Sequence, residues 1–124
     1  MQMKLELVSV PVSDVDKAKL FYTEKLGFTT DHDHKVNENL RFVQLTPPGS
    51  GCSIVIGIGI TSMKPGSLDS LLLVVDDIQK AHEELVKNGV TVTDVKKEDW
   101  GAFHIYFSDP DGNKWQIQQP VHEK

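Results

Sequence analysis

Two seven-residue stretches decide the fold: residues 12–18 read VSDVDKA, and residues 75–81 read VDDIQKA. Each follows an apolar run of strand type and opens an amphipathic segment that ends at a glycine, Gly27 in the first half and Gly89 in the second. Hydroxyl and carboxylate side chains at a helix start accept hydrogen bonds from its first N–H groups, and glycine favours the left-handed conformation just past its end. The sequence therefore predicts one strand-to-helix unit that occurs twice.

Three runs of strand type follow each predicted helix. In the first half they are residues 28–36, 40–46 and 52–58, and in the second they are 90–95, 102–108 and 114–119. Turns rich in proline and glycine, PPGSG and DPDGN, separate the last two strands of each half. This order predicts an α+β fold of two tandem βαβββ modules. The expected boundaries are residues 1–60 for the first module, 61–67 for a linker, 68–120 for the second module and 121–124 for a tail.

The composition excludes several classes of function. The chain has 124 residues, 39% of them hydrophobic, and a net charge of −5. Binding to phosphate backbones needs clustered Lys and Arg, so nucleic acid is not an expected partner, and the charged run at 96–99 reads as a solvated turn. No segment has the length of a membrane span, and the N-terminus lacks the apolar stretch of a signal peptide. With Cys52 as its only cysteine, the chain is expected to be cytoplasmic, without a membrane partner or an internal disulfide.

The repeat and the stretch at 107–113, FSDPDGN, resemble the vicinal oxygen chelate superfamily. It includes glyoxalase I, bleomycin resistance proteins and extradiol dioxygenases. The resemblance covers nearly the whole chain and implies that the sheet of each module curls into a half-cup, with helices outside and a ligand inside. Members close their cups within one chain or between two, and unpaired sheet edges favour association, so a homodimer is expected.

Strand alternation predicts which side chains line this cup-shaped mixed sheet. Successive side chains on a strand point to opposite faces, and the apolar face of each strand packs beneath a helix. The other face, together with a tryptophan just before the seventh strand, forms the predicted lining. Its members are Leu7, Ser9, Phe42, Gln44, Ser70, Leu72, Trp100, His104, Tyr106, Gln116 and Gln118.

The resemblance also implies where a metal ion would bind. The positions that hold the ion in metal-dependent members correspond here to Leu7, Gln44, Ser70 and Gln116. Leucine has no donor atom and serine is a poor ligand, so no metal site and no cofactor are expected. The alternative is a divalent ion on His32 and His34, which alternate with two aspartates, or on His104. The contrasting interpretation is that residues 31–34 form a solvated, inert strand end or loop tip.

Three functions remain open on this basis. The leading one is a glyoxalase/bleomycin-resistance-like protein that binds a small organic molecule in a concave, metal-free pocket. The second is a glyoxalase-like lyase or isomerase, or a dioxygenase, with a non-standard metal site. The third is an interaction module whose cup is filled by its own side chains. If the chain catalyses a reaction without metal, His104 and Tyr106 are the candidate acid/base pair, because imidazole transfers protons near neutral pH and a phenol donates to an oxyanion.

Overall fold

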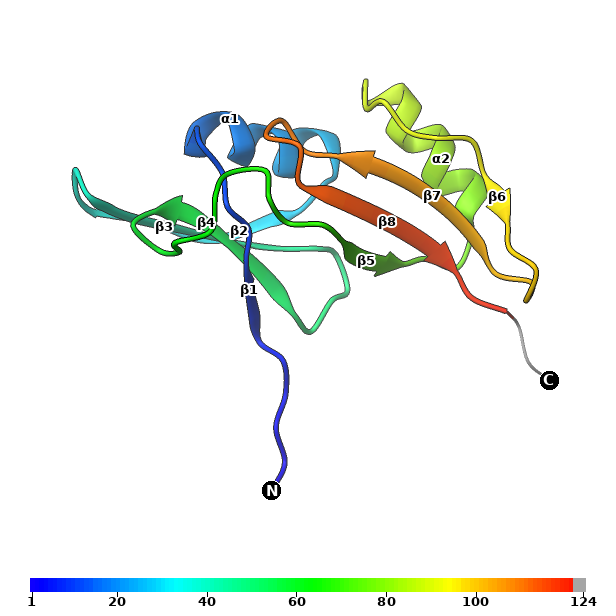
Figure 1. Cartoon of the computed structure of the whole chain (residues 1–124), viewed down its shortest axis with the longest axis horizontal. Helices are drawn as coiled ribbons and strands as arrows, with labels where there is room; N and C mark the ends of the chain where they lie inside the picture. Colours follow the sequence, from blue (N-terminus) through cyan, green and yellow to red (C-terminus); the bar gives the residue numbers. More distant parts are fainter. Residues whose placement is uncertain (122–124) are drawn as a thin grey trace.

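The computed structural model describes residues 1–121 and forms two four-stranded sheets (Figure 1). The first half contains β1 (Leu7–Ser9), α1 (Val15–Leu20), the π-helix η1 (Phe21–Lys25), β2 (Thr29–Asn37), β3 (Leu40–Thr46) and β4 (Ser53–Ile58). The second half contains β5 (Leu71–Val74), α2 (Ile78–Lys87), β6 (Lys96–Lys97), β7 (Phe103–Ser108) and β8 (Lys114–Gln119). The orders are β1-β4-β3-β2 and β5-β8-β7-β6, with the first-listed pair of each sheet parallel and the others antiparallel. The predicted α+β fold with tandem βαβββ modules is confirmed.

The two helices begin and end as the repeat predicts. Asp14 caps α1 by accepting a hydrogen bond from the Lys17 N–H at 3.1 Å, and Asp77 caps α2 in the same way. Gly27 and Gly89 follow the helical segments with φ of 75° and 83°. Only glycine adopts this conformation at little cost, so each helix ends where the sequence places a glycine.

One predicted strand is wrong. Residues 90–95 contain no strand, and β6 is confined to Lys96–Lys97. The hydroxyl of Thr93 accepts the Tyr106 backbone N–H at 2.9 Å, while the Thr93 N–H donates to the Tyr106 carbonyl at 3.0 Å. In a continuous ladder, the Tyr106 N–H would donate to a backbone carbonyl. Here it donates to the Thr93 hydroxyl instead, so regular strand pairing is interrupted.

The helices lie on one side of the two sheets, and the opposite faces are uncovered (Figure 1). We call these the open faces. The N-terminal segment before β1 extends away from the body on the side opposite the helices. None of the helices in residues 1–121 is long and apolar enough to cross a membrane. Val121 is the only residue of the predicted tail that the structure describes; residues 122–124 lie outside the described part.

The DPDGN turn joins the two halves. Its Asn113 side chain donates to the Pro11 carbonyl at 2.7 Å, and Asp111 accepts from the Ser13 backbone N–H at 3.0 Å. Aromatic rings pack beneath it, with Tyr22 of η1 centred 5.7 Å from Trp115 of β8. The first helical segment therefore packs against the second sheet as well as the first. These contacts hold the two sheets together.

Candidate functional site

A row of three rings lies on the open face of the second sheet. Alternation along β7 sends Ile105 into the core and places His104 and Tyr106 on the other face. The His104 and Tyr106 rings are stacked 6.1 Å apart, and the Trp100 ring lies 6.0 Å from His104. Trp100 is 63% exposed and Tyr106 42% exposed. We call Trp100, His104 and Tyr106 the aromatic row.

Amide side chains of β8 lie beside the aromatic row. In the sheet register Gln118 is opposite His104 and Gln116 is opposite Tyr106. Gln116 donates a hydrogen bond to the Ser70 hydroxyl at 2.9 Å, and Leu72 follows on β5 with half of its surface exposed. These predicted lining residues therefore share one surface, as alternation requires.

His104 differs from its neighbours because it is only 5% exposed. Its Nε2 lies 2.8 Å from Gln118 Oε1, and its Nδ1 lies 3.4 Å from Glu98 Oε1. The Glu98 side chain is 13% exposed, so the expectation that residues 96–99 form a solvated turn is wrong at Glu98. The sequence offered no signal for this contact, because the turn at 98–101 folds back over β7 through backbone bonds between Glu98 and residues 101 and 102.

The open face of the first sheet carries a second mixed surface. Leu7 and Ser9 lie on β1, and Phe42 and Gln44 lie on β3. Gln44 donates to the Ser53 hydroxyl at 3.5 Å. This sheet therefore also combines an exposed ring with a hydrogen-bonded amide.

His32 and His34 belong to this face as well. They pair with Gln44 and Phe42 in the β2–β3 register, and the His34 ring lies 5.4 Å from that of Phe42. Cross-strand partners point to the same side of a sheet. The interpretation of residues 31–34 as a strand end or loop tip is wrong, since they lie within β2.

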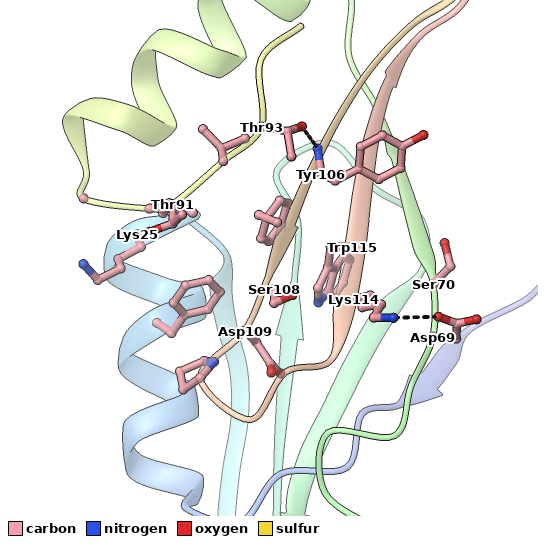
Figure 2. Close-up of a pocket in the computed structure, with 16 residues that line it drawn as sticks. Lys25, Asp69, Ser70, Thr91, Thr93, Tyr106, Ser108, Asp109, Lys114 and Trp115 are labelled. Carbon is pink, nitrogen blue, oxygen red and sulfur yellow. Dashed lines mark hydrogen bonds and ion pairs between the residues drawn. The ribbon is translucent and has the colours of Figure 1, made fainter. Parts of the chain in front are cut away.

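A cavity of about 750 Å³ lies where η1 approaches the second sheet (Figure 2). Tyr106 and Ser70 are the predicted lining residues that border it, and Lys114 at its edge pairs with Asp69 at 3.6 Å. Residues 90–93, at the start of the predicted strand 90–95, form another wall. Because this segment leaves the ladder, it opens space that the strand prediction did not anticipate.

The profile of the Glyoxalase/Bleomycin resistance protein/Dioxygenase superfamily matches residues 4–117. The chain belongs to this superfamily. Its relative YetH of Bacillus subtilis (strain 168), an uncharacterized protein, is 32% identical over 116 residues, covering 90% of this chain and 94% of the relative.

Two solved structures extend the comparison. TnmS3, an antibiotic binding protein from Streptomyces sp. CB03234, is 39% identical, covers 97% of this chain and 98% of its own, and superposes with a TM-score of 0.87. A superfamily member from Sphaerobacter thermophilus DSM 20745 is 32% identical, with 96% and 98% coverage and a TM-score of 0.84. The resemblance inferred from the repeat and the FSDPDGN stretch is therefore confirmed.

The residues at the superfamily's metal positions do not fit a metal ion. Leu7 has no donor atom, and Gln116 and Ser70 are hydrogen-bonded to each other. Gln44 offers a neutral amide, which is a weak ligand for a divalent ion. Within residues 1–121, no three His, Cys, Asp or Glu side chains are grouped closely enough to hold one.

Proposed function

We propose that this protein binds a small, planar organic molecule on its open faces without chemically changing it. The aromatic row carries this proposal. Ligand sites combine apolar and aromatic surface with a few placed polar groups, and the row lies beside the amides of Gln116 and Gln118. Neighbouring exposed rings mark sites where a ligand or partner binds, so the exposed Trp100 and Tyr106 favour a ligand with a flat apolar surface.

The antibiotic-binding relative supports the same class of ligand. TnmS3 shares 39% of its residues with this chain over nearly the full length of both. An antibiotic or a related aromatic natural product is therefore the ligand class that we propose. The similarity to TnmS3 supports a role in binding, but it does not identify the ligand.

Binding is favoured over catalysis by the surroundings of His104. The ring is 5% exposed, Nε2 is engaged by Gln118 and Nδ1 faces Glu98. A general base must come within hydrogen-bond reach of the proton that it removes. Neither ring nitrogen is placed to reach a ligand directly, so the candidate acid/base pair is better explained as part of a binding surface.

We further propose that a second copy of the chain completes the cup. Leu72 and Val74 on the second open face are 53% and 68% exposed, and Leu5 in the extended N-terminal segment is 71% exposed. Burial of such surface is favourable by roughly 25 cal/mol per Å². A homodimer in which each open face meets the partner would enclose the ligand between two sheets.

Fluorescence tests the binding role directly, because the two tryptophans differ in exposure. Trp100 is 63% exposed and Trp115 is 3% exposed. A planar aromatic ligand stacked on the row should quench Trp100 saturably and raise the melting temperature. Trp100→Leu should lose the quenching and weaken the thermal shift, whereas Leu20→Ala, at an exposed apolar position on α1, should behave as wild type. Equal binding by Trp100→Leu, or no response to a broad panel of aromatic natural products, would contradict the proposal.

Metal content separates this proposal from the enzyme alternative. Tag-free protein is incubated with Ni²⁺, Zn²⁺, Fe²⁺ and Mn²⁺, desalted and subjected to elemental analysis. We expect far less than one equivalent of metal. Near-stoichiometric metal that is lost in a His32→Ala, His34→Ala double variant would favour a non-standard metal site instead.

A further inference from the structure

The buried His104 links a carboxylate to an amide of the proposed binding surface. Glu98 Oε1 lies 3.4 Å from Nδ1, which is buried and makes no aligned hydrogen bond within residues 1–121. Gln118 Oε1 lies 2.8 Å from Nε2. Both ring nitrogens therefore face an oxygen atom.

This arrangement places an oxygen atom beside each N–H of a protonated imidazole, although only the contact with Gln118 is a hydrogen bond, and it leaves one nitrogen of a neutral ring facing an acceptor. An imidazolium ring has two N–H donors, whereas a neutral ring has one donor and one acceptor. In the neutral ring, the carboxylate of Glu98 keeps the proton on Nδ1, and Nε2 becomes an acceptor. Gln118 must then turn its carboxamide by half a rotation to present its NH₂ group to Nε2.

The other end of the Gln118 carboxamide is directed away from His104. Gln118 is half-buried, and its amide nitrogen donates no hydrogen bond within the part of the chain that the structure describes. Because Gln118 lies on the open face opposite His104, this nitrogen is available to a ligand beside the aromatic row. When His104 is protonated, Gln118 thus offers its NH₂ group, a donor, to the ligand. When His104 is neutral, Gln118 offers its carbonyl oxygen, an acceptor.

We propose that the Glu98–His104 pair sets which end of the Gln118 carboxamide is offered to the ligand, and that the observed arrangement selects a planar ligand with a hydrogen-bond acceptor such as an aromatic ketone. The inference about ligand class rests on the proposed binding function. His104 is a positioning residue in this scheme, since it acts on the ligand only through Gln118.

The other groups that face His104 are few. Lys96 is opposite it in the β6–β7 register, and its ammonium lies 3.8 Å from the same oxygen of Glu98. Lys96 is 69% exposed, so water screens its charge. Tyr106 stacks on the ring from its own strand, and Trp100 covers its edge. Glu98 is thus the one largely buried charge beside the imidazole among the described residues.

Nuclear magnetic resonance of the ligand-free protein tests the coupling. Histidine ring nitrogens and glutamine side-chain amides are followed between about pH 5.5 and about pH 8.5, across which histidine ordinarily changes charge. We expect the Gln118 side-chain signals, assigned by their loss in Gln118→Leu, to change with the same midpoint as the His104 ring. This change should disappear in His104→Leu and persist in the control His82→Gln on α2. Gln118 signals that do not follow His104, or that still change in His104→Leu, would overturn the proposal.

Two probes of matched shape test the selectivity. They are 2-acetylnaphthalene, which has a carbonyl acceptor, and 2-isopropylnaphthalene, which has none. The ketone should bind about fivefold more tightly at the lower pH, the size expected for one hydrogen bond, and Gln118→Leu should remove this difference. The hydrocarbon should show no such dependence, and an equal dependence for both probes would overturn the selectivity. If neither probe binds, the proposed function loses support, while the ligand-free titration still decides the coupling.

Discussion

Asp109 is the buried residue on which the connection between the two halves depends. The residue is 5% exposed, and its carboxylate accepts four hydrogen bonds. They come from the Tyr22 hydroxyl at 2.7 Å, the Asn113 amide at 2.8 Å, and the backbone N–H groups of Asp111 at 3.0 Å and Asn113 at 2.9 Å. A buried charge is tolerated when its acceptor sites are filled in this way. The hydroxyl of Tyr22 also accepts the Trp115 indole N–H at 3.0 Å, so one phenol of the first half bonds two residues of the second half.

Tyr22→Phe should therefore destabilise the protein without altering its fold. The change leaves the Trp115 indole without its acceptor and removes one donor from Asp109. Leaving buried polar groups unsatisfied costs about 1–3 kcal/mol. Urea unfolding should show this loss, whereas Tyr106→Phe, at an exposed position, should change the free energy of unfolding by less than about 0.5 kcal/mol. Equal stability of wild type and Tyr22→Phe would contradict the role of the network.

The same tyrosine predicts a loss of stability in alkali. Burial, and next the negative charge of Asp109, raises the pKa of Tyr22 well above its ordinary value. Since the folded state disfavours the phenolate, the contribution of Tyr22 is complete below about pH 10, where unfolded tyrosine ionises, and it declines as the pH rises further. Above that pH, wild type should lose up to about 1.4 kcal/mol per pH unit more than Tyr22→Phe. Parallel curves in alkaline urea titrations would contradict this prediction.

At the scale of elements, the β2–β3 hairpin is held by charges rather than by apolar burial. Every residue of β2 is exposed. Asp33 of β2 accepts from Lys19 of α1 at 2.8 Å and from Arg41 of β3 at 2.9 Å, and Arg41 also reaches Asp16 at 2.9 Å. This network connects the outer edge of the first sheet to its helix, and thereby positions His32 and His34 on the open face.

Asp33→Asn should weaken the hairpin in a pH-dependent way. Hydrogen bonds from Arg41 and then Lys19 lower the pKa of Asp33 to about 2. A lowered folded-state pKa means that the stabilisation is present above the unfolded value of about 3.9 and is lost as the pH falls through about 2. Because Asp33 is partly exposed, we expect a cost of only about 1 kcal/mol at neutral pH. This cost should shrink below about pH 4 and vanish only below about pH 2.

Chemical denaturation at several pH values checks the expected difference between wild type and Asp33→Asn. The matched control is Glu38→Gln, which removes an exposed ion pair with Lys35 at 3.6 Å. Exposed ion pairs contribute little to stability, so the free energy of unfolding of this control should be close to that of wild type. If the difference in unfolding free energy between wild type and Asp33→Asn stays constant down to about pH 2, the carboxylate charge is not its cause.

At the scale of the whole molecule, the open faces determine the expected assembly. If the proposed dimer forms, replacing Leu72 and Val74 together by aspartate should convert it to monomer in sedimentation experiments, because charges cannot be buried against an apolar partner surface. Leu20→Asp, on the helix side with 61% exposure, should leave the dimer intact. Wild-type protein that sediments only as a monomer at all concentrations would contradict the composite cup.

Most of the architecture was predictable from short-range patterns. The paired stretches at 12–18 and 75–81 predicted both helix starts, and strand alternation correctly placed Tyr106 and Gln116 opposite the core residues of their strands. These features follow from backbone geometry within a few residues, since a strand has a period of two and a helix start needs a capping acceptor. The lost strand at 90–95 was not predictable, because it depends on which atom of Thr93 meets Tyr106 across the sheet.

The sequence by itself determined the superfamily, the repeated module and the face on which Tyr106 and Gln116 lie. Only the tertiary structure brought Glu98 to His104, placed His32 and His34 beside Gln44 and Phe42, and opened the cavity beside Tyr106. The physical reason is the distance along the chain over which each interaction acts. Periodicity and capping act between neighbours in the chain, whereas the burial of one imidazole depends on where a separate turn folds back over it, and no local pattern encodes that distance.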